Sequence, residues 1–237
     1  TLHYTLDNAG NRTGQDVRDS GNALRRTLSR VYNQLGQLQS QSDAYSHATA
    51  YAYDGNGNTS GVGDALGRGT GNSYDQLNRL KQIIQDVGGI AATTQFKYDA
   101  LDNLTRVTDP KGLNTDYAYN GLGDLAQLSS PDTGVTAYTY DSGGNRKTQT
   151  DARGVTATYG YDALNRLTGI AYPTASLDVG YQYDTVNAAC ASGETHAQGR
   201  LTGIADGSGL TQYCYNRFGE LTRKVQVTGG QSFTTRY

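Results

Sequence analysis

The chain has 237 residues, including 31 glycines and 19 tyrosines but only 3 prolines, 2 cysteines and no tryptophan or methionine. Its formal net charge of −2 gives no electrostatic reason to expect a nucleic acid or an anionic membrane as a partner. Mean hydropathy is −0.64, and no apolar run approaches the length of a membrane-crossing helix, which excludes a helical membrane protein.

A Tyr-Asp or Tyr-Asn step recurs about every 21 residues along the chain. A degenerate Leu6-Asp7 precedes the series and Tyr237 stands at the next expected position. The anchor tyrosines are Tyr32, Tyr53, Tyr74, Tyr98, Tyr119, Tyr140, Tyr161, Tyr183 and Tyr215. A fixed period of this size is typical of repeat proteins, in which each unit is one supersecondary element packed against its neighbours. We therefore predict a single array over residues 1–237, with about ten units.

A residue that tolerates positive φ stands four positions after each anchor. Together with the preceding Asp or Asn, it predicts a type I turn followed by a left-handed residue, the usual three-residue hairpin loop. These turn residues are Gly10, Gly36, Gly57, Asn78, Asp102, Gly123, Gly144, Asn165 and Gly219, and Gly199 has the same role where the pattern resumes after the insertion that follows Tyr183. A second, looser turn is predicted about fourteen residues after the anchor, at positions such as Gly67, Gly112 and Gly154.

The strand that enters each tight turn alternates, as in Tyr51-Ala52-Tyr53. This period of two indicates a half-buried antiparallel strand. We expect the anchor tyrosines to be mostly buried beside leucines of the flanking strands, although a platform for stacking a ligand is the alternative. Leu104 and Val107 are three residues apart in the returning strand, so a bulge at an unknown position is needed to put both on one face.

About twenty strands in one meander exceed what an open twisted sheet usually holds. The fold class is therefore all-β: tandem hairpins in a long antiparallel sheet that curls into a spiral or shell wall. One unit is interrupted by a long loop at residues 187–198. Because the sequence starts at Thr1 in mid-pattern, we also expect a fragment of a longer protein.

The stretches Tyr159–Thr168 and Phe96–Thr105 resemble the RHS/YD repeat, and the resemblance extends over essentially the whole chain. It implies a hairpin ribbon that winds into a hollow shell, as in bacterial RHS polymorphic toxins, the shell proteins of insecticidal Tc toxins, and teneurins. The implied function is a non-catalytic, secreted or cell-surface bacterial shell segment that encloses a partner or C-terminal toxin polypeptide. The alternative is an extracellular adhesive or carbohydrate-binding array.

The implied partners are the remainder of the shell and the enclosed polypeptide, with carbohydrate as a further candidate and no nucleic acid or membrane span. The family also has an autoproteolytic motif that Asp109–Leu113 resembles. This segment lies in mid-array, so we interpret it as an ordinary second turn and expect no enzyme activity. Asp54–Asn58 resembles part of a calcium loop, but Thr59 replaces its required glycine. His3, His47 and His196 have no metal or triad spacing, so we expect no metal or cofactor.

Cys190 lies in the long loop and Cys214 stands between Tyr213 and Tyr215, so alternation points Cys214 away from the aromatic face. If the loop folds back over that face, the two thiols can meet. An even cysteine count in an exported protein favours a disulfide. Two unpaired side chains are the alternative, because the sequence does not give the separation of the two Cα atoms.

Overall fold

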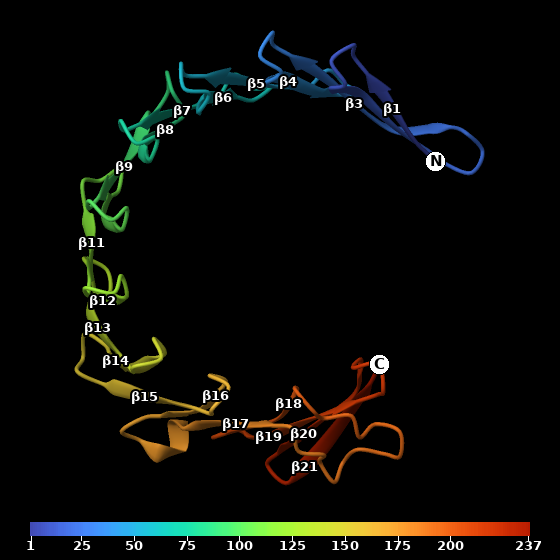
Figure 1. Cartoon of the computed structure of the whole chain (residues 1–237). Coiled ribbons are helices and arrows are strands. Elements are labelled where there is room, and N and C mark those ends of the chain that lie inside the picture. Colours follow the sequence, from blue (N-terminus) through green and yellow to red (C-terminus); the bar gives the residue numbers. More distant parts are fainter. The chain divides into compact units, whose positions relative to one another are not determined.

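The computed structural model describes residues 1–237, which form 21 antiparallel β-strands assigned to one sheet and one short 3-10 helix, η1 (Figure 1). The all-β class and the tandem hairpins predicted from the sequence are confirmed. The chain divides into two compact units, Thr1–Asp116 and Tyr117–Tyr237, and within each unit a strand pairs with the next one along the chain. Winding into a spiral or shell wall stays a prediction.

The first unit contains β1 (Leu2–Leu6), β2 (Arg12–Arg18), β3 (Leu24–Tyr32), β4 (Leu38–Asp43), β5 (Ala48–Tyr53), β6 (Thr59–Gly63), β7 (Gly69–Tyr74), β8 (Leu80–Gln85), β9 (Ala92–Tyr98) and β10 (Leu104–Thr108). Strand β11 (Asn114–Tyr119) contains the boundary between the units. The second unit continues with β12 (Leu125–Ser130), β13 (Gly134–Tyr140), β14 (Arg146–Thr150), β15 (Thr156–Tyr161), β16 (Leu167–Ala171), η1 (Ala175–Leu177), β17 (Val179–Tyr183), β18 (Leu201–Asp206), β19 (Gly209–Tyr215), β20 (Leu221–Thr228) and β21 (Gln231–Arg236). No helix of this chain has the length and apolar character needed to cross a membrane.

A bulge follows the first residue of the returning strand in these hairpins. In the β9–β10 hairpin, Tyr98 pairs with Leu104 and Phe96 pairs with Val107, with the register shift between Leu104 and Arg106. The extra residue in one strand lets two apolar side chains three positions apart share a face. The same shift recurs at the hairpins β3–β4, β5–β6, β7–β8, β13–β14 and β15–β16. The expected bulge is therefore present and recurs at one place in the repeat.

The second turns are not uniformly looser than the first, contrary to the expectation from the sequence. Asp64 N–H donates to the Arg68 carbonyl at 3.0 Å, and Gly67 N–H donates to the Asp64 carbonyl at 3.0 Å. This is the same three-residue loop as at the tight turns. The turns at Asp109 and Asp151 have this geometry too. The second turn is longer after β8, which ends at Gln85, and after β16, which ends at Ala171, because extra residues separate the two strands there.

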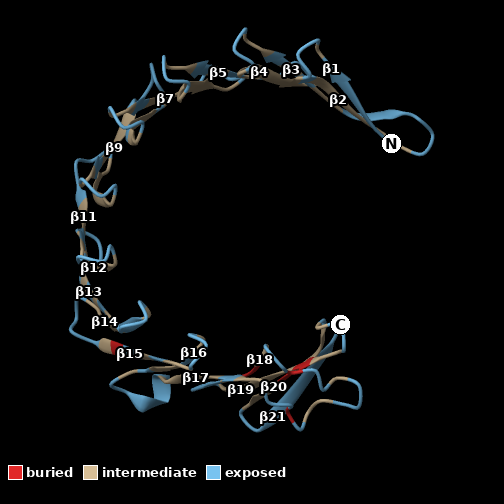
Figure 2. Cartoon of the chain, viewed as in Figure 1, coloured by how far each residue is buried: buried red, intermediate tan, exposed pale blue.

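Buried side chains are few and cluster near the C-terminal end of the second unit (Figure 2). Ala157 is buried in β15, and the others belong to the long loop or to β18, β19 and β20: Asn187, Ala197, Thr202, Cys214 and Val225. Elsewhere most strand residues are exposed or half-buried. A sheet with no second layer over it leaves both faces accessible, so the strands are held by backbone pairing and by contacts along the sheet.

Candidate functional site: the turn edge and the bridged loop

Each tight turn is organised by the aspartate or asparagine after the anchor tyrosine. In the turn at Asp54, Gly57 N–H donates to the Asp54 carbonyl at 3.0 Å. The Asp54 carboxylate oxygen Oδ1 also accepts from the backbone N–H groups of Asn56 and Asn58, both at 2.9 Å. The side chain thus satisfies donors that the turn would leave open. The Asn58 side-chain amide is the main cause that lowers the pKa of Asp54 below its ordinary value.

The ten turn residues singled out from the sequence all have positive φ, between 59° and 87°. The seven of them that are glycine reach this conformation without a Cβ penalty. Asn78, Asp102 and Asn165 reach it as well, with φ of 61°, 66° and 59°. Their side chains have a further role that the sequence pattern did not reveal.

Each of these three side chains accepts a hydrogen bond from the preceding tight turn. Asn58 Nδ2 donates to Asn78 Oδ1 at 2.9 Å, and Asn145 Nδ2 donates to Asn165 Oδ1 at 2.9 Å. Arg79 Nη1 donates to Asp102 Oδ1 at 2.6 Å. In each case the donor is the fifth residue after one anchor and the acceptor lies in the next tight turn. We call this series of side-chain contacts the turn ladder. A signal was present in the sequence, since amide or carboxylate side chains replace glycine at these places.

Arg166 also belongs to the turn ladder and, like Arg79, bonds a carboxylate in each of two turns. Its Nε donates to Asp162 Oδ2 in its own turn at 2.7 Å, and Nη2 donates to Asp184 Oδ2 in the next turn at 2.6 Å. Its guanidinium carbon lies 4.4 Å from the centre of the Tyr183 ring. The Asp184 bond is the largest cause that raises the pKa of Arg166, so this arginine is a permanent positive charge held between two carboxylates.

The anchor tyrosines use their hydroxyls to join one hairpin to the previous one. Tyr53 donates to the Leu38 carbonyl at 2.8 Å, Tyr140 to the Leu125 carbonyl at 2.9 Å and Tyr215 to the Leu201 carbonyl at 2.8 Å. These carbonyls begin the returning strands of the preceding hairpins. The anchor rings are half-buried rather than fully enclosed, because no second layer covers the sheet.

Several tyrosine rings are also covered by arginines. Besides the Arg166–Tyr183 contact, Arg79 lies 4.8 Å from the Tyr98 ring centre and Arg146 lies 5.0 Å from that of Tyr138. A cation over a ring is favourable and occupies the face that a sugar would stack on. Together with the engaged hydroxyls, these contacts favour a structural role for the tyrosines over the alternative of a ligand platform.

Apolar side chains project from the tips of the tight turns, three residues after the anchor. Leu122 is 89% exposed and Leu35 is 83% exposed. We call the set the apolar tips: Leu35, Leu77 and Leu101 in the first unit, and Leu122, Leu164 and Phe218 in the second. These side chains recur at one position of the repeat, and exposed apolar side chains that form a contiguous patch mark a surface that contacts another polypeptide.

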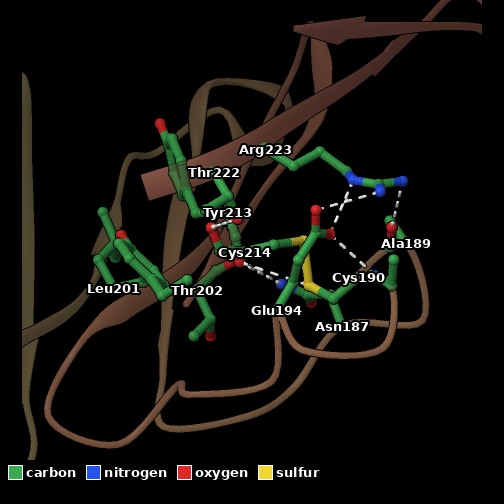
Figure 3. The surroundings of a disulfide bond; sticks show 12 residues. Asn187, Ala189, Cys190, Glu194, Leu201, Thr202, Tyr213, Cys214, Thr222 and Arg223 are labelled. Atoms are coloured by element: carbon green, nitrogen blue, oxygen red, sulfur yellow. Dashed lines mark hydrogen bonds and ion pairs between the residues drawn. A yellow bond between two sulfur atoms is a disulfide. The ribbon is translucent and has the colours of Figure 1, made fainter. Parts of the chain in front are cut away.

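The long loop folds over the face of the sheet opposite the tyrosines (Figure 3). A disulfide joins Cys190 in the loop to Cys214 in β19, with a Cα–Cα distance of 5.4 Å. Thr195 forms a parallel bridge with Tyr215, and His196 N–H donates to the Tyr215 carbonyl at 3.1 Å. The loop is thus attached to β19 both covalently and through its backbone.

An ion pair fixes the loop to the next strand as well. Arg223 of β20 approaches Glu194 of the loop to 2.8 Å, and both side chains are more than four-fifths buried. Arg223 Nη1 also donates to the Ala189 carbonyl at 3.3 Å (Figure 3). The pKa of Glu194 is lowered mainly by the hydrogen bond from the Ala191 backbone N–H and, to a smaller extent, by the hydrogen bond from Arg223. Removing one member of a buried charge pair strongly destabilises a fold, because the remaining charge is left buried without a partner.

The other residues with possible chemistry lie in ordinary structural positions. Asp109 Oδ1 accepts from the backbone N–H groups of Lys111 and Leu113, at 2.9 and 2.8 Å, as Asp54 and Asp151 do in their own turns. His47 pairs with Asp43, whereas His3 contacts Thr1. The structure brings together no group of three or more His, Cys, Asp or Glu side chains that could hold a metal ion.

Residues 11–237 match the family model described as the Teneurin YD-shell. Among solved structures, the chain is similar to TcdB2-TccC3-TEV, with a TM-score of 0.69 at 16% identity over 100% of this chain and 14% of that one. It is also similar to a Photorhabdus luminescens Tc holotoxin pore, with a TM-score of 0.62 at 15% identity over 98% of this chain and 16% of that one. The chain therefore spans less than a fifth of either. None of the curated proteins matches the sequence.

Proposed function

The chain belongs to the Teneurin YD-shell family, and from this premise we propose that it is a non-catalytic wall segment of a shell that encloses a partner or C-terminal toxin polypeptide. The whole of residues 1–237 acts as one repeat array within that wall. The similar solved structures, whose titles name Tc toxin components, support a toxin-associated role. A secreted or cell-surface bacterial location follows from the same proposal.

The observation that carries the proposal is the combination of a sheet without a second layer and a row of apolar tips. Away from the long loop the strands leave both faces accessible, and the tips of the turns present leucines such as Leu101 and Leu122 to the surroundings. A sheet of this kind gains stability when its turn edge packs on further polypeptide, because apolar area is then removed from water. We propose that the apolar tips contact the remainder of the shell.

The polar contacts favour a rigid wall over a catalytic surface. Carboxylates that could act as acids or bases are used as turn acceptors, as Asp54 and Asp109 are, and the arginines link turns. The pKa values of Asp54 and Asp162 are lowered by the hydrogen bonds of their turns, so these two groups are ionised at neutral pH and hold those bonds. General acid–base catalysis uses groups whose pKa lies near the operating pH. The lowered pKa values of these two aspartates do not suit that role.

Protease protection tests enclosure in the longer protein that contains this array. We expect the enclosed polypeptide to survive protease treatment of the intact protein and to be degraded after Leu101→Asp or Leu122→Asp, which put a charge into the proposed contact. Leu210→Asp, at a position in β19 away from the tips, is the control. Equal degradation with and without the tip substitutions contradicts enclosure by this wall.

The alternative function is adhesion or carbohydrate binding, and a binding assay with the purified array tests it. If the purified array binds glycans or cells, and Tyr51→Ala removes that binding without unfolding the chain, the adhesive function replaces the shell. The engaged tyrosine hydroxyls and the arginine-covered rings lead us to expect no such binding.

A further inference from the structure

The turn ladder changes character after the long loop. Arg79 meets the carboxylate of Asp102, and Arg166 meets that of Asp184. Arg200 follows the turn residue Gly199 and has the equivalent place in its hairpin, but the residue it reaches in the next turn is Gly219. The Arg200 guanidinium fills the space where a Cβ on Gly219 would lie. The arginine is thus aimed at the next turn as in the earlier contacts, but the residue that it faces there has no side chain, and the carboxylate of that turn, Glu220, accepts from the Asn216 side chain at 2.7 Å.

The Arg200 side chain is held in place without being neutralised. Its Nη1 donates to the backbone carbonyls of His196 and Gln198, both at 3.0 Å, and its guanidinium carbon lies 5.7 Å from the Tyr215 ring centre. Backbone carbonyls and a ring orient a guanidinium but leave its full positive charge. Its remaining N–H groups are preorganised donors, which reduces the entropy lost when a ligand binds.

A hollow of about 320 Å³ lies beside this guanidinium, between the long loop and the turn that follows β19. Arg200, Arg217 and His196 line it together with Asp184. Arg217 is exposed, packs 4.6 Å over the Phe218 ring and makes no ion pair. Asp184 is the acidic group of the hollow, and its carboxylate is already engaged, because it accepts from the Gly199 N–H and from Arg166, which Asp162 shares.

We propose that this hollow, which we call the Arg200 pocket, binds an oxyanion through Arg200 and Arg217. Carboxylates and phosphates each present two oxygen atoms that can accept the two parallel N–H bonds of a guanidinium group. The ligand takes the place that Asp102 and Asp184 occupy in the earlier contacts of the turn ladder. The long loop is needed because it supplies the His196 and Gln198 carbonyls that orient Arg200.

The test is an NMR titration of the arginine Nε–Hε signals at constant ionic strength. One arm adds sodium phosphate and the other adds a hexaglutamate peptide, with hexaglutamine as its uncharged control. We expect saturable shifts at Arg200 and Arg217 and none at Arg26, an exposed arginine of β3. Saturation by phosphate assigns a site for a free oxyanion, and tighter saturation by hexaglutamate assigns one for an acidic polypeptide. Equal, non-saturating shifts at all three arginines overturn the proposal.

Two pairs of variants separate a bound anion from general charge screening. Arg217→Gln is expected to weaken the tighter probe about tenfold, because a charge-assisted bond is lost, whereas Arg26→Gln leaves it unchanged. Gly219→Asp supplies the missing carboxylate to Arg200 and should abolish binding. Gly219→Asn moves the guanidinium as the Asp variant does but adds no charge, so it should bind the probe more tightly than Gly219→Asp; Asn78 and Asn165 show that asparagine accepts this backbone conformation. Equal binding by the Asp and Asn variants, both folded by thermal denaturation, contradicts the proposal.

Discussion

The side chains of Arg166 and Asp184 lie in successive tight turns, 18 residues apart, and meet in two hydrogen bonds of 3.2 and 2.6 Å. A bidentate contact of this kind fixes the spacing of two neighbouring hairpins at the edge where their backbones are not paired. The same arginine also bonds Asp162 within its own turn. One side chain therefore stabilises both the loop geometry and the stacking of hairpins along the array.

Arg166→Gln is expected to lower the melting temperature, because it removes the contacts with Asp162 and Asp184 and the cation over the Tyr183 ring. Arg153→Gln is the matched control, since the Arg153 side chain bonds only Asp151 in its own turn and is 80% exposed. Thermal denaturation at low and high salt measures both. The Arg166 effect should exceed that of the control and shrink in high salt. Equal effects would show that bridging between turns adds nothing.

The stability of the chain should fall in acid. The pKa of Asp162 is lowered, first by its bond from the Arg166 backbone N–H, and those of Asp54 and Asp141 are lowered as well. A carboxyl whose pKa is lower in the folded state stabilises the fold above its unfolded pKa of about 3.9, and this contribution is lost as the pH falls through the folded value. Melting curves should thus change little between about pH 7 and 5 and shift down below about pH 4.

Asp162→Asn is the control for this pH dependence. Asparagine keeps the acceptor oxygen of the turn, as Asn120 does in its own turn, but it cannot be protonated in this range. The variant should therefore show a smaller loss of melting temperature in acid. An identical acid shift in the variant would assign the effect to other carboxyls.

Tyr140→Phe removes the hydroxyl that bonds the Leu125 carbonyl and should reduce the free energy of unfolding by about 0.5–1.5 kcal/mol. Tyr140→Ala also removes the half-buried ring and should cost more, yet less than the ~3–5 kcal/mol of a fully enclosed aromatic. Urea denaturation measures both. Tyr45→Phe is the control, because Tyr45 lies in a turn and is 82% exposed. A Tyr140→Ala loss equal to that of the control would mean that the aromatic face does not support the fold.

Replacing Cys190 and Cys214 by serine should destabilise the second unit by about 3 kcal/mol, the chain-entropy value for a loop of this length. The loop should then become the first site of proteolysis, because its covalent tie to β19 is gone. Thiol titration of the unfolded, unreduced wild-type chain checks the premise. Two free thiols in that titration would mean that the bridge does not form in solution.

The sequence predicted the hairpins well because their signals are local. The Asp-to-Gly spacing of a turn such as Asp54–Gly57 is set by backbone sterics within five residues, so it can be read without a structure. The bulge after Leu104 was foreseen from the three-residue spacing to Val107, but its position depends on hydrogen bonds with β9. Only the paired strands could place it.

The contacts between turns were missed for the opposite reason. Asn78 was recognised as a residue that tolerates positive φ, yet its bonds to Asn56 and Asn58 join residues 22 and 20 positions apart. The looser second turns were a wrong prediction at Asp64 and Asp109, where glycine alone did not reveal the loop length. The burial of Glu194 with Arg223 depends on how the long loop lies over β20, which no local pattern encodes.

The short reach of these contacts has a consequence for how the chain acquires its structure. Tyr215 bonds a carbonyl only 14 residues earlier, and the longest side-chain contact of the bridged loop, Arg223 to Ala189, spans 34 residues. Loop closure therefore costs little entropy at each step, and assembly can start at any hairpin and spread to its neighbours. A chain emerging from the ribosome can add one finished hairpin after another, without waiting for its distant end.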